Sequence, residues 1–190
     1  MTNREIEIKI RAKDSEPLLR FLEENGSLKS EKHQRDEYFT PANRNFVKEE
    51  PVKEWLRLRE EEGRCSLDYK NWHYADDGRA YHCDEYEVGL DNPVGLKNIL
   101  RALDFESLIV VDKERRTFMF KDYEIALDCV EGLGDYVEVE YKGDENVSDT
   151  KKVAEEMREF VEKTGCQILE QDFVGYPYLL LEKKFGIPAK

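Results

Sequence analysis

Apolar and polar residues alternate along much of this chain, which is typical of β-strands that bury one face. At the start, Ile6, Ile8 and Ile10 alternate with charged residues. Turn residues such as those at 62–63, 76–78, 121–122 and 132–134 separate several of the stretches. The pattern predicts eight strands, over residues 4–11, 34–39, 55–61, 64–71, 81–89, 108–119, 123–129 and 136–142.

Helical periodicity interrupts this alternation in four places. We expect a first helix from N-cap Ser15 to Gly26, a second from Asn92-Pro93 through Leu103, and a third from Ser148 or Asp149 to Gly165. A short fourth helix is expected over residues 178–181. Eight strands with few helices favour an α+β fold, which we predict to be an eight-stranded antiparallel β-barrel or tunnel with helices packed on the outside. The length of 190 residues favours one domain, 1–190.

The polar face of most of the predicted strands carries charges rather than neutral polar groups. For any single strand, a solvated face is the preferred explanation. The same pattern on seven strands is harder to explain by solvation alone. A closed sheet would point these charged faces into a common lumen, where unpaired charges are energetically costly. Clustered carboxylates suit Mg²⁺ or Mn²⁺, and clustered Arg and Lys suit phosphate oxygens. Together they favour a site for a metal-bound polyphosphate.

The amino-acid composition limits the classes of binding partner and site that we expect. The formal net charge is -13, which disfavours nonspecific binding to nucleic acid or to anionic membranes. The four cysteines are widely spaced and predict neither a disulfide framework nor a zinc site. We see no signal peptide and no apolar run of 18 residues, and therefore expect a reduced cytoplasmic protein.

Several of the strands carry motifs that resemble one known family. Residues 5–9 resemble the E-x-E-x-K signature of the CYTH superfamily, also called triphosphate tunnel metalloenzymes. Cys83, Phe118 and Gly175 depart from the residues usual in this family. Further segments that resemble it are HQRDEYF (33–39), WLRLRE (55–60), CDEYE (83–87), DKERRTF (112–118), LDCVEGLGDYVEVE (127–140) and GYPYLLL (175–181).

The resemblance implies a divalent-metal-dependent site for ATP or another triphosphate substrate, and it is compatible with a homodimer. The expected metal ligands are Glu5, Glu7, Asp128, Glu138 and Glu140. The expected substrate-binding residues are Lys9, Trp55, Arg57, Arg59, Lys70, Lys113 and Arg115. Of these two sets, we assign the catalytic roles to Glu7, Lys9, Lys70, Arg115 and Glu138, and expect structural roles for Asp36 and Tyr38.

Two reactions could use the same set of metal-binding carboxylates and phosphate-binding cations. The segment 33–39 and the run 130–140 are most similar to class IV adenylate cyclases, which convert ATP to cyclic AMP and pyrophosphate. Trp55 belongs to a W-L-R-x-R run that is similar to thiamine triphosphatases, and its indole can equally stack on adenine or pack at the rim. We therefore rank a cyclase first, a triphosphatase acting on thiamine triphosphate, inorganic triphosphate or a nucleoside triphosphate second, and a noncatalytic polyphosphate- or nucleotide-binding module third.

Overall fold

A computed structural model describes residues 6–48, 52–74, 80–143 and 149–186, and for Ala80 and Tyr81 only the backbone. The chain divides into two compact units. The first unit contains Met1–His33 and Lys113–Gly175, and the second contains Gln34–Asp112 and Tyr176–Lys190. Two long strands, β2 (Ser27–Pro41) and β6 (Phe105–Phe120), each contribute one part to each unit.

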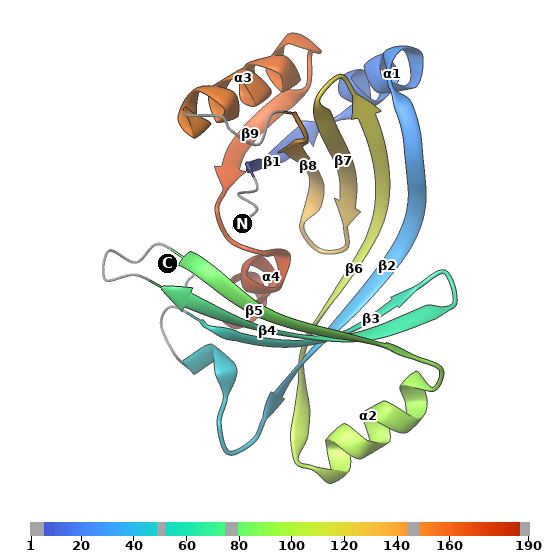
Figure 1. Cartoon of the computed structure of the whole chain (residues 1–190), viewed down its shortest axis with the longest axis vertical. Coiled ribbons are helices and arrows are strands. Elements are labelled where there is room, and N and C mark those ends of the chain that lie inside the picture. The colour runs from blue at the N-terminus through green and yellow to red at the C-terminus, as the bar shows by residue number, and fades with distance from the viewer. Residues whose placement is uncertain (1–5, 49–51, 75–79, 144–148, 187–190) are drawn as a thin grey trace. The chain divides into compact units, whose positions relative to one another are not determined.

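The first unit is an antiparallel sheet with two helices on one face (Figure 1). Its strands follow the hydrogen-bonded order β2-β6-β7-β8-β1-β9. The elements that lie wholly in this unit are β1 (Glu7–Asp14), α1 (Glu16–Asn25), β7 (Tyr123–Val130), β8 (Gly134–Tyr141), α3 (Thr150–Lys163) and β9 (Gln167–Asp172).

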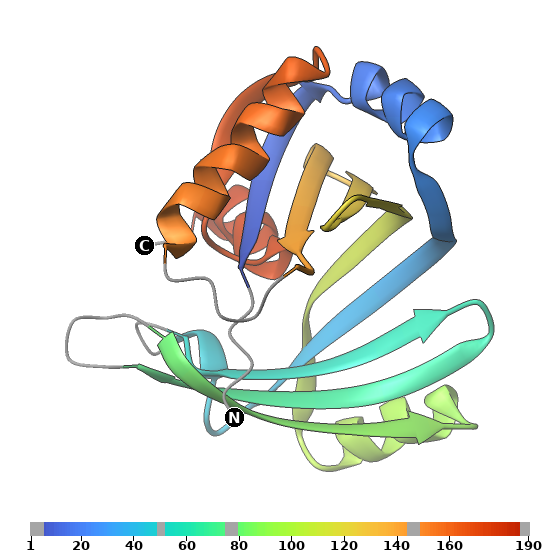
Figure 2. The same ribbon diagram turned by 45° about the horizontal axis from the view of Figure 1, so that its top comes forward.

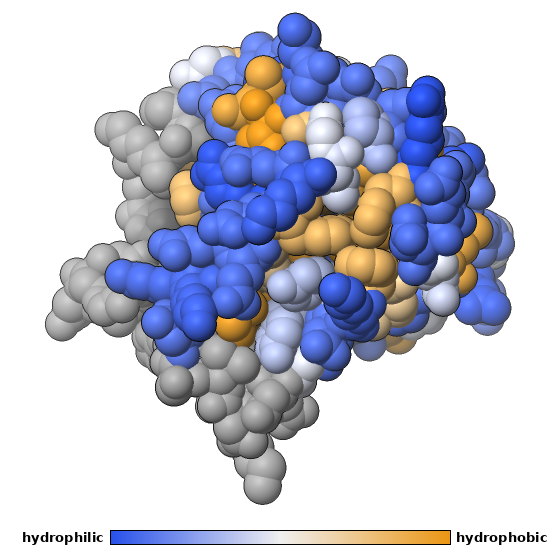
Figure 3. Space-filling model, turned by 90° about the horizontal axis from the view of Figure 1, so that it is seen from above, coloured by the Kyte–Doolittle hydropathy of each residue, from blue (hydrophilic) through white to orange (hydrophobic). Residues whose placement is uncertain are grey.

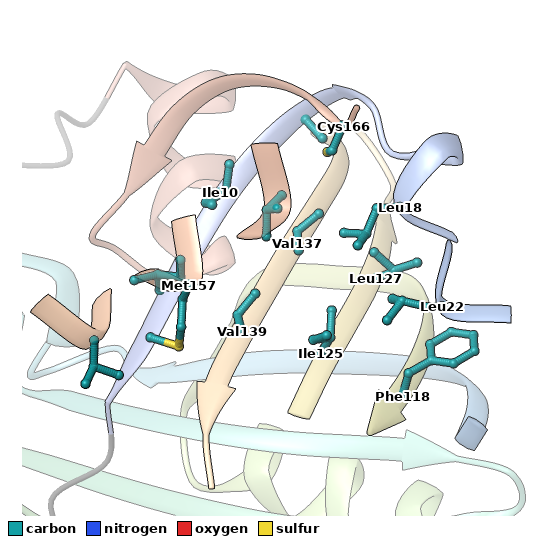
Figure 4. Close-up of a cluster of buried hydrophobic side chains, with 14 residues drawn as sticks. Ile10, Leu18, Leu22, Phe118, Ile125, Leu127, Val137, Val139, Met157 and Cys166 are labelled. Atoms are coloured by element: carbon teal, nitrogen blue, oxygen red, sulfur yellow. The ribbon is translucent and has the colours of Figure 1, made fainter. Parts of the chain in front are cut away.

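The core of the first unit lies between this sheet and its helices, as Figure 4 shows. Ile10 and Val139 come from neighbouring strands, Leu22 comes from α1 and Met157 from α3, and all four are fully buried. Each such side chain contributes roughly 1.5–3 kcal/mol through burial. The isoleucine face of β1 is therefore the core face, and the charged residues of β1 lie on the opposite face of the sheet.

The helix boundaries follow local hydrogen bonding. Asp149 caps α3 as expected, because its side chain accepts a hydrogen bond from the Lys152 amide at 3.0 Å. Ser15 occupies the N-cap position of α1 but makes no side-chain capping bond. Asp14 accepts a hydrogen bond from the Glu16 amide instead, at 3.0 Å, so the capping group comes one residue earlier than expected.

The second unit has its own antiparallel sheet, in the order β5-β4-β3-β2-β6. Figure 2 shows α2 lying across one face of it, where Leu100 packs with Leu56 and Leu58. On the other face, Tyr178 of α4 contacts Trp55. The elements wholly in this unit are the short 3₁₀ turn η1 (Phe46–Lys48), β3 (Glu54–Glu61), β4 (Arg64–Tyr74), β5 (Ala80–Leu90), α2 (Pro93–Ala102) and α4 (Tyr176–Phe185).

The predicted α+β class with an antiparallel sheet is confirmed, and all four helices are present. Two details differ. There are nine strands in place of eight, because β9 pairs with β1. The strand order also begins at β5 and ends at β9, and the described residues contain no pairing that closes it into a barrel. The outer edge of β1, which a barrel would use for closure, is occupied by β9.

Hydrophilic residues dominate the face drawn in Figure 3, and apolar residues are visible there in separate patches. This agrees with a charged-residue content of 38%. Among the described residues, no helix is long and apolar enough to span a membrane.

Candidate functional site

The charged face of the first unit brings together most of the predicted metal and phosphate ligands. The strand register sets their positions, because directly paired residues share a face. Lys9 pairs with Glu138, Glu7 with Glu140, and Arg115 with Asp128. Among the described residues of this unit, the predicted ligands on this face are Glu7, Lys9, Lys113, Arg115, Asp128, Glu138 and Glu140. Glu5, also predicted to bind metal, lies outside the described residues.

Asp128 is the most deeply buried carboxylate on this face, with its side chain fully inaccessible. Arg115 donates from Nε to Asp128 Oδ1 at 2.6 Å, and Lys113 Nζ lies 3.1 Å from Oδ2. Such a charge is stable in the interior only when it is paired in this way. Asp128 therefore fixes two of the predicted phosphate-binding cations in place, a role that the strand pattern alone did not indicate.

Glu138 has two cationic neighbours. Arg115 donates a hydrogen bond to it, and Lys9 Nζ lies 3.4 Å from Oε1. Burial favours the neutral acid, but Arg115 and Lys9 outweigh this effect and hold the pKa of Glu138 below its usual range. Glu138 is therefore an anion at neutral pH, available to a cation that can compete with Arg115 and Lys9.

Glu7 and Glu140 complete a group of acidic side chains near Glu138. Loss of hydration raises the pKa of Glu7, and repulsion from Glu138 and Glu140 adds to this, although Lys9 opposes it. Glu140 is paired with Lys142. A divalent cation would relieve the repulsion among these carboxylates, and oxygen ligands are those that Mg²⁺ and Mn²⁺ prefer. The donor set thus fits such an ion.

The carboxylates are not arranged around a ready-made metal position. Within the described residues, no three Asp, Glu, His or Cys side chains form a group that could hold a metal ion. The reason is visible in the ion pairs, since Arg115, Lys9 and Lys142 occupy carboxylate oxygens. Metal binding at Glu138 and Glu140 would require these cations to move away.

β9 adds residues that the sequence patterns did not identify. Asp172 lies directly opposite Lys9, and Glu170 lies opposite Arg11, with Arg11 Nη1 3.3 Å from Glu170 Oε1. Asp172 is hydrogen-bonded to the buried Tyr136. Burial raises the pKa of Asp172, against the opposing effects of Tyr136 and Lys9. The charged face of this unit thus extends over one more strand than expected.

A second cationic face lies in the second unit, where β3 presents Arg57 and Arg59. Arg59 makes a two-bonded ion pair with buried Asp36, from Nε at 2.7 Å and from Nη2 at 2.6 Å. Arg57 Nε donates to buried Asp68 at 2.9 Å. These pairs fix the direction of both guanidinium groups, as a structural role for Asp36 predicts. Asp68 is not among the predicted site residues, and its pairing with Arg57 is seen only in the structure.

Lys70 and Trp55 lie beside this arginine pair. They are cross-strand partners, and Lys70 Nζ is 3.0 Å from Glu85 Oε1. The Trp55 ring makes edge contacts with Tyr38 at 5.4 Å and with Tyr178 at 5.2 Å between ring centroids. Trp55 is therefore held by aromatic neighbours, whether or not it also contacts a substrate.

Comparison with known proteins agrees with these motifs. A family model described as the CYTH domain matches residues 3–171. A protein of Methanocaldococcus jannaschii named putative adenylate cyclase MJ0240 is 30% identical over 178 residues, which cover 93% of this chain and 97% of the relative.

Solved structures show the same fold. The PH1819 protein of Pyrococcus horikoshii superposes with a TM-score of 0.70 at 26% identity, over 95% of this chain and 100% of that one. A protein of Hippeastrum, described as putative adenylyl cyclase HpAC1 with a dominant triphosphatase activity, has a TM-score of 0.62 at 16% identity, with 94% of each chain covered. The family model and the archaeal relative each extend over most of the sequence, and the chain therefore belongs to the CYTH family.

Proposed function

We propose that this protein is a divalent-metal-dependent enzyme acting on a triphosphate, and that it converts ATP to cyclic AMP and pyrophosphate. The observation that carries the proposal is the charged face of the first unit, where the carboxylates of Glu7, Glu138 and Glu140 lie beside Lys9, Lys113 and Arg115. The family supports a triphosphate substrate and a divalent ion, and the archaeal relative at 30% identity carries the name of an adenylate cyclase.

The roles of the residues follow from their charges. Glu7, Glu138 and Glu140 would hold Mg²⁺ or Mn²⁺, with Asp128 and Glu5 as the further ligands that we expect. A bound divalent ion supplies positive charge to phosphoryl oxygens and lowers the pKa of a hydroxyl group bound to it. Asp128 is engaged by Arg115 and Lys113, so its direct participation would require both cations to shift.

Lys9, Lys113 and Arg115 would bind the phosphate oxygens. In the cyclase reaction the ribose 3′-hydroxyl loses its proton and attacks the α-phosphorus, while the bond from that phosphorus to the pyrophosphate oxygen breaks. Negative charge would build on the oxygens that these cations bind, and cations placed beside those oxygens would stabilise that charge. We assign Arg57, Arg59 and Lys70 in the second unit to phosphate binding as well. The CYTH model spans parts of both units, which supports our proposal that residues 1–190 form one domain.

A triphosphatase is the second candidate. Water would then attack the terminal phosphorus in place of the ribose hydroxyl, and the same cations would serve. Two observations favour it: the Hippeastrum neighbour is described by its dominant triphosphatase activity, and Trp55 lies two residues before Arg57 in a run similar to thiamine triphosphatases.

Product identification separates the two reactions. The purified protein is incubated with ATP and Mn²⁺, and in parallel with thiamine triphosphate and with inorganic triphosphate. Cyclic AMP together with pyrophosphate supports the cyclase, whereas orthophosphate without cyclic AMP contradicts it and supports the triphosphatase. Glu138→Gln serves as the matched control, since it removes the charge of one carboxylate and is expected to abolish turnover in either case.

A further inference from the structure

Asp172 reaches the charged face of the first unit because β9 contains a bulge. Ile168 pairs with Ala12 on the core face, and Glu170 pairs with the next residue of β1, Arg11, so Leu169 is an extra residue in the ladder. A bulge of this kind changes which face the following side chains occupy. Without it, Asp172 would share the core face with Ile168; with it, Asp172 lies opposite Lys9.

Lys9 consequently has a carboxylate on each neighbouring strand. Glu138 pairs with it from β8 and Asp172 from β9. The Lys9 Nζ atom lies 3.4 Å from Glu138 Oε1 and 3.4 Å from the carbonyl oxygen of Val174, just beyond β9. The Glu138 distance is longer than that of a tight ion pair, and the Val174 carbonyl lies just beyond the end of β9, so the ammonium group already contacts the β9 side.

Buried Tyr136 fixes the position of Asp172. Tyr136 is fully buried and is hydrogen-bonded through its side chain to Asp172. Phenols do not ionise near neutral pH, so the tyrosine is the donor and the carboxylate is the acceptor. Asp172 is therefore a pre-positioned negative charge on the side of Lys9 that faces away from Glu138.

We propose that Asp172 is a positioning residue: it is the partner that Lys9 adopts when Glu138 takes part in binding a divalent cation. This inference rests on the proposed function, because it assumes that Glu138 is a metal ligand. A cation at Glu138 repels the Lys9 ammonium group, which must then lose its ion pair or find another. Asp172 and the Val174 carbonyl offer that alternative, and the phosphate-binding lysine stays charged and next to the site.

The test measures Mn²⁺ affinity in the full chain by calorimetry, without substrate. Asp172→Asn keeps the shape of the side chain and an acceptor for Tyr136 but removes the charge. We expect Asp172→Asn to bind Mn²⁺ about fivefold more weakly, in the range of couplings between neighbouring groups. Asp172→Glu should recover most of the affinity. Glu170→Gln, a neighbour on β9 that pairs with Arg11 instead, is the matched control and should bind like the wild type.

A double-mutant cycle with Lys9→Met identifies the mechanism. If Asp172 acts through Lys9, Asp172→Asn has no effect on Mn²⁺ affinity once Lys9 is methionine. An equal loss in both backgrounds would show that Asp172 simply attracts cations, and unchanged affinity in Asp172→Asn alone would also overturn the inference. Thermal unfolding of each variant without metal checks that the fold is kept. A wild-type protein that binds no Mn²⁺ would contradict the proposed function itself and this role with it.

Discussion

Arg115 donates hydrogen bonds to both Asp128 and Glu138, so one guanidinium group joins a fully buried carboxylate to one that we expect to bind metal. The same residue therefore supports the fold of the first unit and sets the charge of its candidate site. Substitutions at this position should affect stability and activity together, whereas most of the other site residues should separate them.

Arg115→Gln should lower the free energy of unfolding by about 3 kcal/mol, because the fully buried Asp128 carboxylate then loses its ion pair with Arg115. Turnover should fall by at least about 100-fold, as expected for loss of a group that stabilises developing charge. Urea unfolding and steady-state kinetics measure the two effects. The control is Arg116→Gln, the next residue on β6, which is paired with exposed Glu31 and should change stability by no more than about 0.5 kcal/mol. An Arg115→Gln variant as stable as the wild type would contradict the role of the ion pair.

Glu7→Gln should make the protein more stable at pH 7 in the presence of EDTA. The pKa of Glu7 is raised in the folded state, so its ionised form is favoured more in the unfolded chain. The wild type consequently loses stability as the pH rises from the unfolded pKa, about 4.3, through the higher folded pKa. The advantage of Glu7→Gln should disappear below about pH 4.

Thermal unfolding across this pH range measures the difference. Adding Mn²⁺ should raise the melting temperature of the wild type more than that of Glu7→Gln, because a ligand stabilises the state that binds it. A Glu7→Gln protein that melts below the wild type at pH 7 in EDTA would contradict the claim that loss of hydration and repulsion disfavour the Glu7 carboxylate in the folded state.

Asp36→Ala should lower the free energy of unfolding by about 3 kcal/mol, because it removes a buried carboxylate and leaves Arg59, whose side chain is only 26% exposed, without its two-bonded partner. Binding of inorganic triphosphate should also weaken, since the direction of both guanidinium groups depends on Asp36. Chemical denaturation and calorimetry measure the two effects. Glu159→Gln, an exposed partner of Lys163 on α3, is the control and should change neither. Normal triphosphate affinity in Asp36→Ala would place Arg59 outside the binding site.

Trp55→Leu separates a packing role from a substrate-stacking role. If the indole stacks on adenine, KM for ATP should rise by about tenfold while KM for inorganic triphosphate, which has no base, stays constant. Equal increases for both substrates would show that the substitution acts only through the contacts of Trp55 with Tyr38 and Tyr178. Trp72→Leu, on β4, is the control: it also removes one indole group, but Trp72 is not among the predicted substrate-binding residues.

Much of the fold could be predicted from local patterns. Alternation located the strands because one face of each sheet is apolar, as Ile10 and Val139 show. The expected strand 34–39 is the second part of a longer strand, β2, which begins at Ser27. The first part of β2 is largely exposed, so it does not have one apolar and one polar face for the sequence pattern to reveal. β9 was not predicted because its bulge at Leu169 disrupts the alternation on which strand prediction depends.

The sequence predicted which residues form the candidate site, but not which carboxylate forms an ion pair with which cation. The alternation along each strand predicted which side chains share a face. The register of β1 with β8 agrees with this prediction, since Lys9 lies opposite Glu138. Which carboxylate binds which cation depends on contacts between residues far apart in the sequence, such as Arg59 with Asp36. The part played by Asp172 depends on a bulge, a buried tyrosine and a cross-strand lysine together, and no single motif carries that information.

The most direct measurement is a calorimetric titration of inorganic triphosphate into the wild-type protein, with Mn²⁺ and again with EDTA. Inorganic triphosphate isolates the group that a cyclase and a triphosphatase both recognise. We predict saturable binding with Mn²⁺ and affinity about tenfold or more weaker in EDTA, because the metal and the cations of the charged face bind the phosphates together. No binding, or the same affinity in both buffers, would contradict a metal-dependent triphosphate site.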